Sequence, residues 1–147
     1  MFNSLNSDGL PLYDSDIISA RLYAEAEKRG VQKQFADLWR QLNEQIAELE
    51  EIGIANINSI LMQHMYFTRA INKEIISNTG AINVTTPGLR RYFIEINKDP
   101  ISNPVVMCSE MLKLVRIWKR VSEYPLIKIL LKFNENSKLF LASYFYR

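Results

Sequence analysis

Two long stretches of the chain repeat apolar residues at alternating intervals of four and three positions. In the first, which runs from residue 31 to residue 52, these are Phe35, Trp39, Leu42, Ile46 and Leu49. In the second, which follows Asn103-Pro104, they are Met107, Met111, Leu114, Trp118 and Val121. Such spacing places the apolar side chains on one side of an α-helix and the charged residues on the other. We therefore expect a mostly α-helical fold.

Three glycines follow apolar runs at positions where helices commonly end. Gly30, Gly53 and Gly80 each come after a run with helical periodicity. Glycine is common just beyond a helix C-terminus, because it adopts the left-handed conformation without a steric penalty. The first helix is expected to begin near residues 14–15, an Asp-Ser pair of which either member can cap a helix. The third is expected to cover about residues 56–77.

These boundaries predict one helical domain over residues 14–147, preceded by an N-terminal arm of residues 1–13. Within this domain, the second and third helices are expected to pair as an antiparallel hairpin core over residues 31–80, because short connections favour antiparallel neighbours. The second apolar stretch predicts a further amphipathic helix over residues 104–123, with additional helices packed around the hairpin.

Two segments of the sequence are compatible with more than one structure. Residues Leu89–Ile96 fit a short helix with Thr86 as its cap and Pro87 in its first position, and they fit a strand almost equally well. Residues 126–147 fit either a helix or a β-hairpin with a turn at residues 134–137, and we favour the helix.

The residue inventory excludes several classes of protein. The single cysteine, Cys108, cannot form an internal disulfide and suits a reducing compartment. No stretch approaches about 18 uncharged apolar residues, so no membrane-spanning helix is expected. Residues Met1–Leu12 lack the basic start and apolar run of a signal peptide. We therefore expect a cytoplasmic protein, in the host cytoplasm if the source is a virus.

Side chains suited to catalysis or metal binding are scarce. The only histidine, His64, shares the apolar stripe of its helix and is expected to be a hydrogen-bonded core or interface residue. Cys108 is expected to be a small core residue. The chain has no glycine-rich phosphate loop. We predict no catalytic residue, no metal site and no cofactor, and hence no enzyme.

Charge is unevenly distributed along the chain. Residues 1–60 hold five basic and ten acidic side chains, whereas residues 61–147 hold thirteen basic and six acidic ones. Such a division can let copies of a protein attract each other, or direct one face toward a polyanion. It is also compatible with an ordinary solvated surface.

The predicted helix over residues 104–123 carries several of these cations opposite its apolar stripe. Cations that share one helix face can contact phosphates and release counterions, although Glu110 and Glu123 dilute this face. An ordinary solvent-exposed face is the alternative. The candidate DNA-binding residues are Lys113, Arg116, Lys119 and Arg120, with Arg90 and Arg91 as a second, smaller basic pair.

The order of these elements resembles the small terminase subunits of tailed bacteriophages over about residues 35–122. The resemblance begins with a long helix that contains Leu38, Trp39, Leu42 and Leu49 and is followed by Gly53. A second long helix contains Tyr66-Phe67 and Lys73-Glu74 and is closed by Gly80. A last helix opens at Asn103-Pro104 and contains Lys113, Arg116 and Arg120.

The resemblance implies a component of phage DNA packaging. Small terminase subunits recognise the viral genome, assemble into rings and regulate the large terminase subunit, which carries the ATPase and nuclease. Our first hypothesis is therefore a non-enzymatic, homo-oligomeric adaptor that binds double-stranded DNA and the large subunit. The apolar stripe of the first stretch would form its subunit interface, with Phe35, Trp39, Leu42, Ile46 and Leu49.

A second hypothesis is a protein–protein interaction module with no nucleic-acid role, such as a structural connector or an inhibitor of a host factor. In that case the apolar stripes would bind a partner helix, and the cations would only keep the surface soluble.

Overall fold

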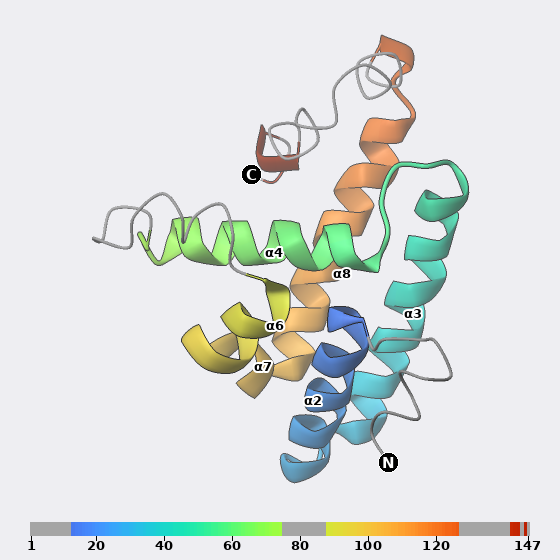
Figure 1. Ribbon diagram of the computed structural model, residues 1–147. Coiled ribbons are helices and arrows are strands. Elements are labelled where there is room, and N and C mark those ends of the chain that lie inside the picture. Colours follow the sequence, from blue (N-terminus) through green and yellow to red (C-terminus); the bar gives the residue numbers. More distant parts are fainter. Residues whose placement is uncertain (1–12, 75–87, 127–141, 145, 147) are drawn as a thin grey trace, which may run out of the picture.

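The computed structural model describes residues 13–74, 88–126, 142–144 and 146, and its elements in this described part are helices (Figure 1). These elements are α2 (Asp14–Lys28), α3 (Gln32–Glu51), α4 (Ile57–Ile71), α6 (Leu89–Arg91), the π-helix η1 (Tyr92–Ile96), α7 (Asp99–Ser102) and α8 (Pro104–Ser122). The mostly α-helical fold expected from the apolar periodicity is confirmed. Among the described residues, no helix is both long and apolar enough to cross a membrane.

Helix α8 occupies the centre of the described structure. Helices α2, α3, α4 and α7 all pack against it, with α3 lying along it over the largest contact (Figure 1). Pro104 starts α8 in the first helical turn, where a missing backbone N–H has no cost. The five members of its apolar stripe are all buried: Met107, Met111, Leu114, Trp118 and Val121. The predicted amphipathic helix is therefore confirmed, and its apolar side forms the middle of the core.

Helices α3 and α4 do not form the expected antiparallel hairpin over residues 31–80. Helix α4 lies across α8 instead of running back along α3, and each of the two packs on α8 (Figure 1). The connection between them contains Ile54 and Ala55, which are both buried. This short link is therefore held in the core and turns the chain, so that α8 takes the place expected for α4 as the neighbour of α3.

The apolar stripe of α3 lies inside the chain rather than on a subunit interface. Trp39 is partly buried and stacks on Phe35, with 5.7 Å between the ring centroids. A regular apolar spacing indicates that another helix packs on that side. It does not indicate whether the other helix belongs to the same chain. The predicted interface is thus wrong for the four members that are at most 3% exposed: Phe35, Leu42, Ile46 and Leu49.

Two of the three expected glycine helix ends are confirmed. Gly30 has a φ of 70° and Gly53 a φ of 74°, in the left-handed region. Beyond α2, the backbone N–H of Val31 donates to the carbonyl of Ala26 over 2.9 Å, which closes the helix end. At the end of α3, the backbone N–H of Ile54 donates to the carbonyl of Leu49 in the same way.

The third helix ends earlier than the sequence suggested. Helix α4 begins after Asn56, whose side chain accepts from the Ser59 backbone N–H, and it stops at Ile71 rather than near residue 77. Lys73 then adopts the left-handed conformation with a φ of 57°. Gly80, the expected terminator, lies outside the described residues.

The two ambiguous segments are only partly described. Residues Leu89–Ile96 are helical, first as α6 and then as η1, so the helix alternative is confirmed. The proposed cap at Thr86-Pro87 lies outside the described residues, as does the arm of residues 1–13 apart from its last residue. In the tail, residues 142–144 are helical, and most of the segment for which helix and hairpin were considered is not described.

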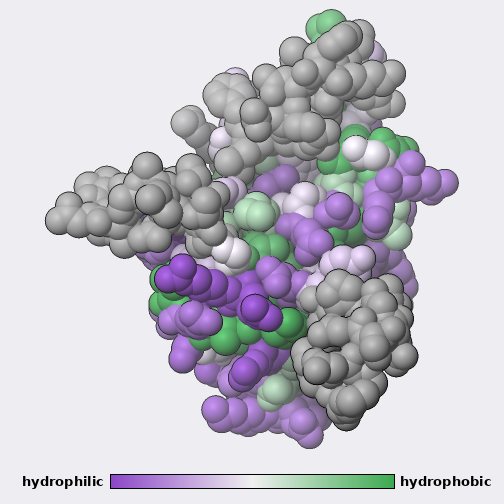
Figure 2. All heavy atoms as spheres, viewed as in Figure 1, coloured by the Kyte–Doolittle hydropathy of each residue, from purple (hydrophilic) through white to green (hydrophobic). Residues whose placement is uncertain are grey.

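Among the coloured residues in Figure 2, hydrophilic ones cover most of the visible surface, and apolar ones appear there in patches. Inside the core, the Trp118 indole N–H donates to the side-chain oxygen of Gln63 over 2.7 Å. Trp118 is fully buried and Gln63 is 5% exposed. Because a buried polar group without a partner is costly, this bond fixes the rotation of α4 against α8.

Replacing Gln63 by Leu tests this bond. The substitution leaves the indole N–H of Trp118 buried without an acceptor, and we expect the free energy of unfolding to fall by about 1–3 kcal/mol. Urea denaturation measures it. Gln41→Leu on the exposed side of α3 is the matched control, with an expected change below about 0.5 kcal/mol. Equal effects of the two substitutions would contradict the prediction.

Candidate functional site

Three of the predicted DNA-binding residues share one exposed side of α8. Lys113, Arg116 and Arg120, called the basic face below, are all exposed. At about 100° per residue they fall within one narrow arc of the helix, opposite the buried stripe. Arg120 also lies in the last helical turn, where the helix dipole favours a positive charge. The grouping predicted from periodicity thus has the expected geometry for these three cations.

Lys119 does not belong to the basic face. Its ammonium nitrogen lies 2.6 Å from a carboxylate oxygen of Glu48 on α3, and its side chain is only 34% exposed. This ion pair joins the acidic first part of the chain to the basic second part. Lys119 is therefore less available to a phosphate than the three residues of the basic face, and its phosphate contact stays a prediction.

The three cations of the basic face differ in their surroundings. The ammonium of Lys113 lies 4.1 Å from the ring centroid of Tyr146, in a cation–π contact. Arg116 and Arg120 have no ion-pair partner among the residues that the structure describes. The two guanidinium groups are thus the side chains on α8 most available to an anion.

Arg90 and Arg91 are exposed but belong to another part of the surface. They lie on the short helix α6, which packs on α2, α4 and η1. The predicted set of six cations is therefore divided into the basic face of α8, the paired Lys119 and a separate pair on α6.

His64 is a buried, hydrogen-bonded histidine, as expected. It is 3% exposed, and its Nε2 lies 2.7 Å from a carboxylate oxygen of Glu110 on α8. This hydrogen bond lowers the pKa of Glu110, and the charges of His64 and Lys113 lower it further, whereas partial burial opposes the shift. The sequence did not identify Glu110 as the partner, because 46 positions separate the two residues.

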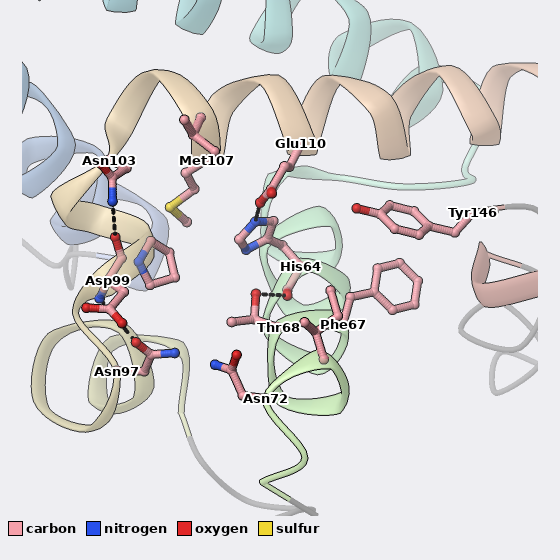
Figure 3. Close-up of a pocket in the computed structure, with 13 residues that line it drawn as sticks. His64, Phe67, Thr68, Asn72, Asn97, Asp99, Asn103, Met107, Glu110 and Tyr146 are labelled. Carbon is pink, nitrogen blue, oxygen red and sulfur yellow. Dashed lines mark hydrogen bonds and ion pairs between the residues drawn. The ribbon is translucent and has the colours of Figure 1, made fainter.

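His64 and Glu110 line a cavity of about 230 Å³ between α4, α7 and α8. Figure 3 shows His64 surrounded by side chains from these helices and from the link before α7. This cavity could not be predicted from the sequence, since its lining residues come from segments far apart in the chain. The polar members are His64, Thr68, Asn72, Asn97, Asp99, Asn103, Glu110 and Tyr146.

The described residues contain little that suits metal or thiol chemistry. They include no group of three or more His, Cys, Asp or Glu side chains that could hold a metal ion. Cys108 is fully buried, and burial raises the pKa of its thiol to about 12. Since the thiolate is the reactive form, Cys108 is a core residue rather than a nucleophile.

Comparisons of this chain with protein-family models, with curated proteins and with solved structures found no match. The resemblance to small terminase subunits therefore stays a prediction. The function has to be inferred from the surface and the cavity of the chain itself.

The lowered pKa of Glu110 predicts how this pair contributes to stability at acid pH. Because the folded-state pKa lies below the usual value of 4.5, ionised Glu110 stabilises the fold above about pH 4.5. That contribution is lost as the pH falls through the folded-state pKa. In a His64→Leu variant the main cause of the shift is absent, so the Glu110 pKa should rise toward 4.5 in a carbon-13 NMR titration. An unchanged midpoint would show that His64 is not the cause.

Proposed function

We propose that this protein is a non-enzymatic adaptor that binds double-stranded DNA through phosphate contacts of the basic face of α8. The observation that carries the proposal is the exposure of Arg116 and Arg120 on one side of α8, without an ion-pair partner in the described part of the chain. Lys113 extends the same face by one turn toward the helix N-terminus.

The spacing of these cations suits a phosphate backbone. Arg116 and Arg120 are one turn apart, about 6 Å along the helix axis, and Lys113 extends the row to about 10 Å. Duplex DNA carries one negative charge per about 1.7 Å of its axis, so each cation can meet a phosphate. A guanidinium group can also bind phosphate oxygens with two parallel hydrogen bonds.

The position of α8 in the fold favours backbone contacts over the recognition of base edges. Four other helices pack against α8, and only a narrow side of it is available to a ligand. A helix that reads base edges must enter the major groove, which is about 12 Å wide. Contacts to phosphates position a protein on DNA without reading its sequence, and this is the binding mode that we propose.

The wider role follows from the resemblance stated above. We propose that the adaptor is homo-oligomeric and acts with a large terminase subunit in viral genome packaging. Since the stripe on α3 is buried within the chain, the subunit contacts of such an oligomer would use other surfaces. The alternative, a protein–protein interaction module, predicts no binding to DNA.

The double substitution Arg116→Gln and Arg120→Gln tests the proposal. We expect weaker binding to duplex DNA, because two phosphate contacts are lost. We also expect the slope of log K against log salt concentration to become shallower by about 1.8, at about 0.9 for each contact. Fluorescence anisotropy with a labelled duplex, repeated over a range of salt concentrations, measures both effects.

The matched control removes two cations from another exposed helix end, Lys28→Gln and Arg29→Gln on α2, where both lie within 4 Å of Glu25. This control should retain the affinity and the salt slope. Equal slopes for the two double variants would contradict the assignment to α8. If the unmodified protein does not bind DNA in size-exclusion light scattering with added duplex, the interaction-module alternative stands.

A further inference from the structure

Two carboxylates, several amides and apolar groups line the cavity beside His64. Its charged lining residues are Asp99 and Glu110, and no lysine or arginine is among the described residues that line it. Lys113 lies near one edge, over the ring of Tyr146, but is not part of the lining. Asp99 has no ion-pair partner in the described part of the chain, whereas Glu110 is bonded to His64. The site therefore attracts a cation, mainly through Asp99, and repels an anion. Its ligand therefore differs from the phosphates proposed for the basic face.

The carboxamides around the cavity have their orientations fixed by their partners. The Asn72 nitrogen donates to a Glu74 carboxylate over 3.3 Å, and the Asn103 nitrogen donates to the Asp99 backbone carbonyl over 3.2 Å. A carboxylate and a backbone carbonyl can only accept, so each amide must direct its nitrogen toward them. The carbonyl oxygens of Asn72 and Asn103 have no hydrogen-bond partner in the described part of the chain. They are acceptors available to a ligand.

Further acceptors lie on the same wall. The Thr68 hydroxyl donates to the backbone carbonyl of His64 over 2.8 Å, so its oxygen is left as an acceptor. Nε2 of His64 carries the hydrogen of its bond to Glu110, because a carboxylate can only accept. The other ring nitrogen, Nδ1, is buried and has no hydrogen-bond partner among the described residues. Buried polar atoms without partners are uncommon, and His64 is one of the residues that line the cavity.

Apolar and aromatic groups complete the site. Met107 and Pro100 line it, and at its rim Ile71 is 71% exposed and Val106 is 55% exposed. The rings of Phe67 and Tyr146 lie with their centroids 4.7 Å apart on the side away from α7 (Figure 3). Aliphatic surface suits a short alkyl chain, and ring faces attract a cation.

We infer that this cavity binds a small organic cation, a primary ammonium or guanidinium group on a short alkyl chain. The ligand donates hydrogen bonds to the carboxylates of Asp99 and Glu110 and to the neighbouring carbonyl oxygens. Its alkyl chain lies against Met107 and Val106. The cavity volume of about 230 Å³ accommodates a short alkyl chain beside the charged group. The inference does not depend on DNA binding, since it concerns another ligand and a different set of residues.

Binding of n-butylammonium to the nitrogen-15-labelled protein tests the inference. We expect saturable NMR shifts of the Asn72 and Asn103 side-chain amide signals. We expect n-butanol and butyrate, which match the probe in chain length but lack the positive charge, to bind at least about tenfold more weakly. Neither compound can form the charge-assisted hydrogen bond of an ammonium group. The loss of one such bond lowers the affinity by about that factor. Equal affinities for n-butanol and n-butylammonium would overturn the inference.

Asp99→Asn and Glu110→Gln keep the side-chain shape and remove one charge each. Either should lower the affinity for n-butylammonium about tenfold. Asp37→Asn and Glu44→Gln, two exposed carboxylates that pair with Arg40 on α3, are the matched controls and should retain it. Since Glu110→Gln also alters the contact with His64, Asp99→Asn decides the outcome if the other variant fails to fold. Unchanged affinity in Asp99→Asn would overturn the inference.

Discussion

The burial of the apolar side of α8 holds the described helices together. Helices α2, α3, α4 and α7 share α8 as a neighbour, and its five-membered apolar stripe is almost completely removed from solvent. The Trp118–Gln63 hydrogen bond lies in this core and sets the rotation of α4. Because the inner side of α8 is fixed in this way, the identity of its outward-facing residues is fixed as well. The surface chemistry of the protein thus follows from its core.

That outward side carries two kinds of chemistry within a few turns of one helix. Toward its N-terminus, Glu110 bonds to His64 and lines a cavity rich in hydrogen-bond acceptors. Toward its C-terminus, Arg116 and Arg120 present positive charge to solvent. Lys119 lies on a neighbouring side of α8, close enough to α3 to be neutralised by Glu48. Lys119 and Arg120 are about one quarter turn apart around α8. Arg120 is available to a ligand, whereas Lys119 forms an ion pair within the fold.

Local features of the structure could be predicted from the sequence, whereas features that depend on distant segments could not. Apolar periodicity and helix-ending glycines predicted α3 and α8, since both signals act within a few residues. The separation of α4 from α3 could not be predicted, because it depends on both helices packing on α8. The pairing of His64 with Glu110 joins residues 46 positions apart, and that of Lys119 with Glu48 joins residues 71 apart. The helix end at Lys73 was missed because only glycine was considered for a left-handed position.

Tyr146 belongs to both surfaces, since its ring lines the cavity and also lies beneath the ammonium of Lys113. A molecule that enters the cavity and moves this ring would also change the freedom of Lys113 to meet a phosphate. Coupling of that kind is reciprocal, so occupation of either surface would alter the affinity of the other by the same factor. If both proposed ligands bind, this one aromatic ring couples their binding equilibria.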